Sequence, residues 1–269
     1  MPRFAANLSW LFTELPFLDR FAAAAEAGFE AVEFLFPYEH PPEALARCVE
    51  ANGLEVVLFN LWPGDWAAGE RGFGALPGQE EAFRETLGRA LPYLEALRCP
   101  RIHALAGVPP AGSDSEICCE TFVANLRLAA EHFAPLGVTL LIEPINPQDV
   151  PGYFLTRQDQ AVAILDAVGT KNTALQMDLY HCQKVEGDPA VWIERNVARI
   201  GHVQVANPPG RHEPNQGEID YPPLFDLLDR LGYSGWIGCE YKPKHDTWLG
   251  LGWAERYGIS GGQRAAQAS

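Results

Sequence analysis

The stretch GVTLLIEPINP, residues 137–147, contains the pattern that decides the fold. Gly137 ends a segment with helical spacing, since glycine is common just beyond the C-terminus of a helix. A short apolar run follows and ends on the carboxylate of Glu143. Pro144 and Pro147 donate no backbone N–H group, so they end strand pairing there. We therefore interpret the stretch as a buried strand that carries a charge at its carboxyl end.

The same unit repeats along the whole chain. Eight runs with strand character cover residues 3–9, 31–36, 54–60, 100–107, 138–144, 173–180, 200–207 and 235–241. Segments with helical spacing separate them, at residues 18–29, 41–53, 80–99, 115–137, 156–169, 188–197 and 221–233. Alternation of near-continuous apolar strands with helices predicts a parallel sheet that helices cover.

The number of units favours a closed barrel. Eight βα units in about 250 residues fit a single-domain α/β fold, the (β/α)₈ TIM barrel. A doubly wound open sheet shows the same alternation, but it normally carries a glycine-rich phosphate loop after its first strand. Here NLSWLFTELPF, residues 7–17, follows the first strand and contains no such loop. We predict one barrel domain over residues 1–258 and a flexible C-terminal tail over residues 259–269.

Composition limits the kinds of partner. The chain has 20 basic and 35 acidic residues, and the net charge of −15 repels nucleic acid and anionic membrane surfaces. No segment approaches about 18 consecutive apolar residues, and the N-terminus lacks the layout of a signal peptide. The six cysteines form no C-x-x-C pair. We expect a cytoplasmic protein with a small-molecule substrate; the sequence leaves open whether copies form a homo-oligomer.

Oxygen donors stand at the ends of four consecutive strands, where a barrel places its active site. They are Glu143, Asp178, Gln204 and Glu240. Because one βα unit separates each from the next, the four side chains can converge. Clustered carboxylates repel one another unless a cation lies among them, and oxygen ligands favour Mg²⁺ or Mn²⁺ over zinc. The alternative for each acid taken alone is a residue paired with a buried Arg or Lys or with a backbone amide.

Other polar residues are candidates for substrate contacts. His181, in the loop expected after the sixth strand, either binds a ligand or is a helix-capping or surface residue. Glu33 is either a substrate contact or one member of a structural pair, and the direction of His103 depends on strand register. Arg71 and Arg211 lie in glycine-rich loops that suit a lid. Both suit an anionic substrate, or they are ordinary solvated charges.

Seven separated blocks resemble the hydroxypyruvate isomerase family, within the larger xylose isomerase-like TIM barrel superfamily. The resemblance covers roughly residues 3–258. Its blocks are FAANLSWLFTELPFLDRF (4–21), GFEAVEFLFPY (28–38), NLWPGDWAAGERGF (60–73), LLIEPINPQDVPGYFL (140–155), QMDLYHCQ (176–183), HVQVANPPGRHEPNQGEI (202–219) and GCEYKP (238–243).

The resemblance implies a TIM barrel that binds a divalent metal and transfers protons through Glu143 and Glu240. The ligands that it implies are Glu143, Asp178, Gln204 and Glu240. Similarity to related sugar epimerases implies substrate contacts from His181 and Arg211. Those epimerases usually carry a histidine where Gln204 stands, which favours the isomerase branch and leaves the identity of the metal open.

We therefore expect an isomerase that interconverts hydroxypyruvate and 2-hydroxy-3-oxopropanoate (tartronate semialdehyde), or a close four-carbon 2-oxo sugar acid. Such a reaction removes a proton beside a carbonyl, passes through an enediolate and returns a proton to the neighbouring carbon. The alternatives are a ketose 3-epimerase, a dehydratase of the superfamily and a non-catalytic barrel that binds sugar acids. The net charge and the small number of histidines disfavour an endonuclease.

Overall fold

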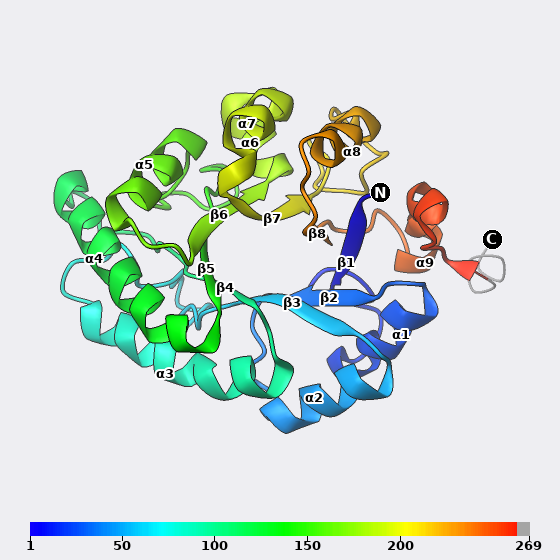
Figure 1. Ribbon diagram of the computed structural model, residues 1–269, viewed down its shortest axis with the longest axis horizontal. Coiled ribbons are helices and arrows are strands. Elements are labelled where there is room, and N and C mark those ends of the chain that lie inside the picture. Colours follow the sequence, from blue (N-terminus) through cyan, green and yellow to red (C-terminus); the bar gives the residue numbers. More distant parts are fainter. Residues whose placement is uncertain (263–269) are drawn as a thin grey trace.

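The computed structural model describes residues 1–262 and confirms the closed barrel (Figure 1). Within these residues, eight parallel strands pair in chain order, and the first also pairs with the last. The strands are β1 (Arg3–Asn7), β2 (Ala31–Phe34), β3 (Glu55–Asn60), β4 (Arg101–His103), β5 (Thr139–Ile142), β6 (Thr173–Asp178), β7 (Ile200–Val205) and β8 (Trp236–Cys239). Since β8 returns to β1, the open-sheet alternative is excluded.

Helices surround the strands on the outside (Figure 1). The α-helices are α1 (Arg20–Glu26), α2 (Pro42–Ala51), α3 (Glu80–Leu97), α4 (Ser115–Phe133), α5 (Gln158–Val168), α6 (Leu179–Glu186), α7 (Pro189–Asn196), α8 (Tyr221–Arg230) and α9 (Thr247–Gly250). Short 3₁₀ helices are η1 (Phe17–Asp19), η2 (Ala134–Leu136), η3 (Val197–Arg199) and η4 (Leu251–Tyr257). Each predicted helical segment contains a helix. No described helix is long and apolar enough to cross a membrane; the cytoplasmic location stays a prediction.

Helix α6 is the main difference from the sequence prediction, which extended the sixth strand to residue 180. The strand ends at Asp178, whose side chain accepts hydrogen bonds from the backbone N–H groups of Tyr180 and His181. This is an N-cap, and it starts a helix directly at the strand end. His181 therefore lies in the first turn of a helix rather than in a loop.

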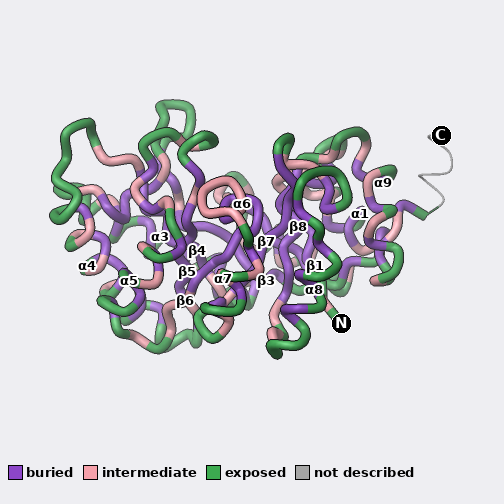
Figure 2. Tube along the Cα trace, turned by 90° about the horizontal axis from the view of Figure 1, so that it is seen from above, coloured by how far each residue is buried: buried purple, intermediate pink, exposed green. Residues whose placement is uncertain are grey.

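The barrel interior changes from apolar to polar along its axis. A small apolar cluster consists of Ala5, Ala31, Val57 and Trp236. Two residues further along β1 and β2, on the same faces of these strands, stand Asn7 and Glu33. The larger apolar core joins residues of the strands and of the surrounding helices, and Figure 2 colours most of each strand as buried. The strands therefore lead from an apolar base to a polar layer.

The ordered structure continues past the predicted end of the domain at residue 258. Ile259 is buried, and the backbone N–H of Ser260 donates to the Ala27 carbonyl at 2.9 Å. Gly28 and Gly258 meet so closely that a Cβ on Gly28 would lie 2.3 Å from the Gly258 oxygen. The residues that follow η4 therefore pack against the turn that follows α1. Residues 263–269 of the predicted tail lie outside the described residues.

Candidate active site

A pocket of about 410 Å³ opens at the carboxyl ends of the strands. Its polar wall includes Asn60, His103, Glu143, His181, Arg211 and Glu240. Trp10, Phe36 and Trp66 supply aromatic wall on the side of the first three strands. The pocket therefore combines several convergent polar groups with an apolar rim, which is the usual composition of a small-molecule site.

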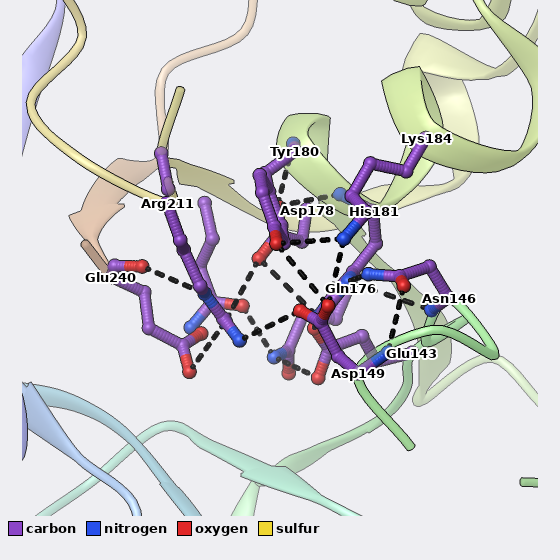
Figure 3. Close-up of polar contacts among 12 residues, drawn as sticks. Glu143, Asn146, Asp149, Gln176, Asp178, Tyr180, His181, Lys184, Arg211 and Glu240 are labelled. Carbon is purple, nitrogen blue, oxygen red and sulfur yellow. Dashed lines mark hydrogen bonds and ion pairs between the residues drawn. The ribbon is translucent and has the colours of Figure 1, made fainter. Parts of the chain in front are cut away.

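Three side chains form a compact cluster at the ends of β5 and β6 (Figure 3). Glu143, Asp178 and His181 each offer a ligand atom, and these atoms lie within 4.8 Å of one another. Nε2 of His181 lies 3.8 Å from Glu143 Oε1 and 3.8 Å from Asp178 Oδ2. While Asp178 Oδ1 caps α6, its buried Oδ2 has no hydrogen-bond partner among residues 1–262. That oxygen is a candidate ligand atom for a cation.

Arg211 lies among the carboxylates (Figure 3). Its Nη2 is 3.2 Å from Glu240 Oε1 and 3.5 Å from Asp178 Oδ2. Its guanidinium also lies 4.6 Å from the ring centre of Trp10 and 5.1 Å from that of Tyr180. The indole N–H of Trp10 donates to Glu240 Oε1 at 3.2 Å. The predicted substrate residue thus reaches the site and links two of the predicted metal ligands.

The loop that carries Arg211 is fixed by its own hydrogen bonds. Backbone groups of Asn207 and His212 exchange two hydrogen bonds, of 2.9 and 3.1 Å. The Asn207 side chain donates to the carbonyl of Ile219 and accepts from its N–H. The Arg211 carbonyl accepts from the N–H of Lys242 at 2.7 Å, and Arg211 itself has a left-handed φ of 56°. These contacts determine where the guanidinium lies.

Burial and mutual repulsion shift the protonation of the acidic groups toward the neutral form. Burial raises the pKa of Glu143 well above its ordinary 4.5, and the charges of Glu240 and Asp178 raise it further. Burial likewise raises the pKa of Asp178, and it raises that of Glu240 to about 8. Burial lowers the pKa of His181 well below 6.5 and that of His103 to about 3. The site therefore combines carboxyl groups that can hold a proton near neutral pH with uncharged imidazoles.

Gln204 reaches the cluster through a residue that the sequence analysis did not select. The Gln204 Oε1 accepts from Nε2 of Gln176 at 2.7 Å, and the same Nε2 donates to Glu143 Oε2 at 2.9 Å. Gln176 stands two residues before Asp178 on β6, so both side chains project from the same face of the strand. That period of two was the signal that could have identified it.

The other candidate residues take different places. Arg71 is not among the residues that line the pocket; its guanidinium lies 3.6 Å from the ring centre of Trp66. Glu33 is one member of a structural pair, because His202 Nε2 lies 2.6 Å from its Oε2. His103 faces the pocket, with Nδ1 3.6 Å from Glu143 Oε2, and its ring nitrogens have no hydrogen-bond partner in the described part of the chain.

The donor set fits a hard divalent cation. Carboxylate and amide oxygens are the ligands that Mg²⁺ and Mn²⁺ prefer, and Asp178 Oδ2 has ion-pair contacts but no hydrogen bond among the described residues, so it can serve as a ligand. The compact cluster also contains His181, which the sequence analysis assigned to substrate binding. Glu240 is connected to Asp178 by Arg211, and Gln204 to Glu143 by Gln176. All four predicted ligands therefore belong to one connected network.

The fold is a closed (β/α)₈ barrel, and the compact cluster with its acid–base groups lies at the carboxyl ends of the strands. This is where TIM-barrel enzymes have their active sites, so the protein has the architecture of that class. A profile of the xylose isomerase-like TIM barrel family matches residues 21–257. The chain belongs to this family. Its named relatives place it within the hydroxypyruvate isomerase family and confirm the predicted enzyme class, an isomerase.

Relatives with isomerase names match almost the whole chain. A 2-oxo-tetronate isomerase from Cupriavidus necator is 57% identical over 257 residues, which are 96% of this chain and 99% of the relative. A hydroxypyruvate isomerase from Escherichia coli is 47% identical over 257 residues, 96% of this chain and 100% of the relative. A crystal structure described as a family 2 AP endonuclease from Brucella melitensis superposes with a TM-score of 0.94 at 50% identity, covering 96% and 99% of the two chains.

Proposed function

We propose that the protein interconverts the aldose and ketose forms of a short 2-oxo sugar acid. The substrate is hydroxypyruvate, with 2-hydroxy-3-oxopropanoate as its isomer, or the four-carbon homologue that the Cupriavidus necator relative is named for. One observation carries the proposal: Glu143 and Glu240, from two different strands, line the same pocket as buried carboxyl groups. A proton can therefore be removed and returned on the two sides of one bound molecule.

Proton transfer is the task of the two glutamates. One takes the proton from the carbon beside the carbonyl, and the other delivers a proton to the neighbouring carbon of the enediolate. The proton of the substrate hydroxyl passes to the former carbonyl oxygen, so the reaction involves no net gain or loss of protons. Raised pKa values suit both tasks, since the ionised partner is a stronger base and the neutral partner holds its proton near pH 7. The indole of Trp10 donates to Glu240 and so orients its carboxyl group.

The metal is proposed to be Mg²⁺ or Mn²⁺. The residues that we propose to hold it are Glu143, Asp178, Gln204 and Glu240. Of these, Glu143 and Asp178 lie with His181 in the compact cluster. When bound, it would stabilise the negative charge that develops on the enediolate oxygens.

Substrate recognition is proposed to use Arg211 and His181, which line the pocket. Arg211 is the cation that suits a substrate carboxylate, and the neutral His181 can donate or accept a hydrogen bond. Arg71 contacts Trp66 in the loop that follows β3, which we call the Trp66 loop. We propose that Arg71 contacts the substrate carboxylate when this loop covers the pocket. The aromatic wall limits the access of water to the reacting carbons.

A substrate panel in D₂O tests the reaction. The purified protein with Mg²⁺ or Mn²⁺ is incubated with three- and four-carbon 2-oxo acids and with neutral ketoses, and products are followed by NMR. We expect isomerisation with solvent deuterium entering only the acids. Conversion of ketoses alone would indicate a 3-epimerase, and metal-dependent binding without deuterium exchange would indicate a non-catalytic barrel. Abasic-site DNA should stay uncut, since the net charge of −15 repels it.

Replacing either glutamate tests the mechanism. We expect Glu143→Gln and Glu240→Gln each to lower kcat by about 10²- to 10⁴-fold, because an amide transfers no proton. Circular dichroism should show an unchanged fold. Glu131→Gln, on the exposed face of α4, is the matched control and should keep normal turnover. Near-normal turnover in either active-site variant would contradict the two-carboxyl mechanism.

A further inference from the structure

We propose that Glu33 is a positioning residue: it fixes the direction of a chain of hydrogen bonds that presents the Gln204 carbonyl and the Glu143 carboxylate to the site. The residues of this chain, in order, are Glu33, Gln204, Gln176 and Glu143. It runs through the barrel interior from β2 to the end of β5. The inference rests on the metal site of the proposed function.

The chain begins at a carboxylate that is completely buried. Oε1 of Glu33 accepts from Asn7 Nδ2 at 2.9 Å and from Gln204 Nε2 at 2.8 Å, and Oε2 lies 2.6 Å from His202 Nε2. Oε1 of Glu33 is the acceptor in both of these amide hydrogen bonds. Gln204 must therefore turn its NH₂ group toward Glu33, and its carbonyl oxygen must point the other way.

The orientation of Gln204 then determines that of Gln176. Because the Gln204 oxygen needs a donor, Gln176 presents Nε2 to it, and this nitrogen also donates to Glu143 Oε2. The Gln176 Oε1 is left buried without a hydrogen-bond partner among the described residues. An amide that leaves its own oxygen unsatisfied is oriented by its neighbours. Figure 3 shows this amide beside Glu143.

The two carboxylate oxygens of Glu143 have different neighbours. Oε2 is held by Gln176 and lies 3.6 Å from the ring of His103. Oε1 accepts no hydrogen bond in the described structure and faces His181 Nε2 at 3.8 Å, within the compact cluster. Oε2 is thus the anchored oxygen, and Oε1 is the one available to a cation.

Gly238 leaves room for the Glu33 carboxylate because it has no side chain. A Cβ on Gly238 of β8 would lie 2.3 Å from both carboxylate oxygens of Glu33. Gly238 has no left-handed φ, so it is needed for room and not for backbone conformation. It also pairs with Gln204 in the register of β7 and β8. A simple ion pair with His202 would use only Oε2, whereas Oε1 binds two amide donors.

Mn²⁺ binding to the purified full chain, measured by calorimetry, tests the proposal without reference to turnover. We expect Glu33→Gln to raise the Kd for Mn²⁺ by about 10- to 100-fold, the usual effect of losing a group that orients a ligand. Glu55→Gln, at the exposed start of the neighbouring strand β3, is the control and should leave the Kd within about twofold. The double variant Glu33→Gln/Gln204→Glu exchanges acceptor and donor and should return the Kd to within about tenfold of wild type.

Two results would overturn the inference alone: an unchanged Kd in Glu33→Gln, or a double variant that binds Mn²⁺ no better than Gln204→Glu. The double variant keeps the test decisive even where Glu33→Gln does not fold, because it restores a donor and acceptor pair. Gln176→Met should also raise the Kd for Mn²⁺, because Glu143 Oε2 and the Gln204 carbonyl would lose the donor that they share. A wild-type protein that binds no Mn²⁺ would instead overturn the metal site itself, and this inference with it.

Discussion

Arg211 is the residue on which anion recognition and the charge balance of the site both depend. It lies 3.2 Å from Glu240, 3.5 Å from Asp178 and 3.7 Å from Asp149, measured between side-chain nitrogen and oxygen atoms. No comparable cluster of acids surrounds Arg71, whose described contacts are with Trp66 and the Glu70 carbonyl. The two arginines, which loop composition alone did not distinguish, therefore have different surroundings.

Alanine substitution separates their roles. We expect Arg211→Ala to raise KM for the 2-oxo acid at least about tenfold, which corresponds to a loss of about 1.4 kcal/mol of binding free energy. Arg71→Ala should raise KM by a smaller factor, because Arg71 reaches the pocket only through the Trp66 loop. Steady-state kinetics on acid substrates measure both. An unchanged KM in both variants would contradict an anionic substrate.

The residues that could be predicted are those whose position follows from strand periodicity. Glu143, Asp178 and Glu240 were predicted to converge because each ends a strand, and the structure places all three around Arg211 or His181. The place of Arg211 could not be predicted from periodicity, and only the resemblance to related sugar epimerases indicated it. It depends on a left-handed φ and on the side-chain hydrogen bonds of Asn207, neither of which follows from a local pattern.

Among the elements, the junction between β6 and α6 was the hardest to predict. The apolar run continues past Asp178, so periodicity alone extends the strand to residue 180. The deciding interaction is the cap that Asp178 Oδ1 provides to α6. One carboxylate thus starts a helix with one oxygen and faces the site with the other, and the short helix brings His181 beside Glu143.

Strand β8 makes room for the interior carboxylate, and this gives a prediction about stability. We expect Gly238→Ala to lower the free energy of unfolding by about 1–3 kcal/mol, because the added Cβ would meet the Glu33 oxygens at 2.3 Å. Gly88→Ala is the control: its Cβ would meet nothing within 4 Å on the exposed face of α3. It should stabilise the protein by about 0.5–1 kcal/mol. Urea unfolding measures both, and equal effects would contradict the steric argument.

At the scale of the whole molecule, the buried acids link stability to pH. Glu240 has a pKa of about 8 in the folded chain against 4.5 in its ordinary state, because of burial. Between these values the folded state holds more protons than the unfolded state, so stability falls as pH rises. In EDTA we expect the free energy of unfolding to fall from pH 5 to pH 8, and more steeply than in Glu240→Gln.

Added Mn²⁺ should reverse this trend, because it binds the deprotonated carboxylates and so stabilises the folded state more at pH 8 than at pH 5. Urea unfolding at the two pH values, with EDTA and with Mn²⁺, gives the four measurements. Stability in EDTA that rose steadily from pH 5 to pH 8 would contradict the raised pKa of Glu240.

The architecture as a whole was the most predictable level. Repetition of strand and helix over eight units indicated the barrel, and the absence of a phosphate loop after β1 distinguished it from an open sheet. The C-terminal boundary could not be predicted in the same way. The packing of Ile259 and the bond from Ser260 to Ala27 join segments more than 230 residues apart, and local composition carries no information about them.

The shared space of Glu33 and Gly238 has a consequence for how this lineage can change. The Glu33 carboxylate fills the space that a side chain at position 238 would need, although the two positions are about 200 residues apart. A larger residue at position 238 therefore requires a shorter one at position 33. A descendant that gains a side chain on β8 must first lose the long acid on β2, and it then also loses the acceptor that orients Gln204. Substitution at these two sites should therefore be concerted across related sequences, with small residues on β8 accompanying a glutamate on β2.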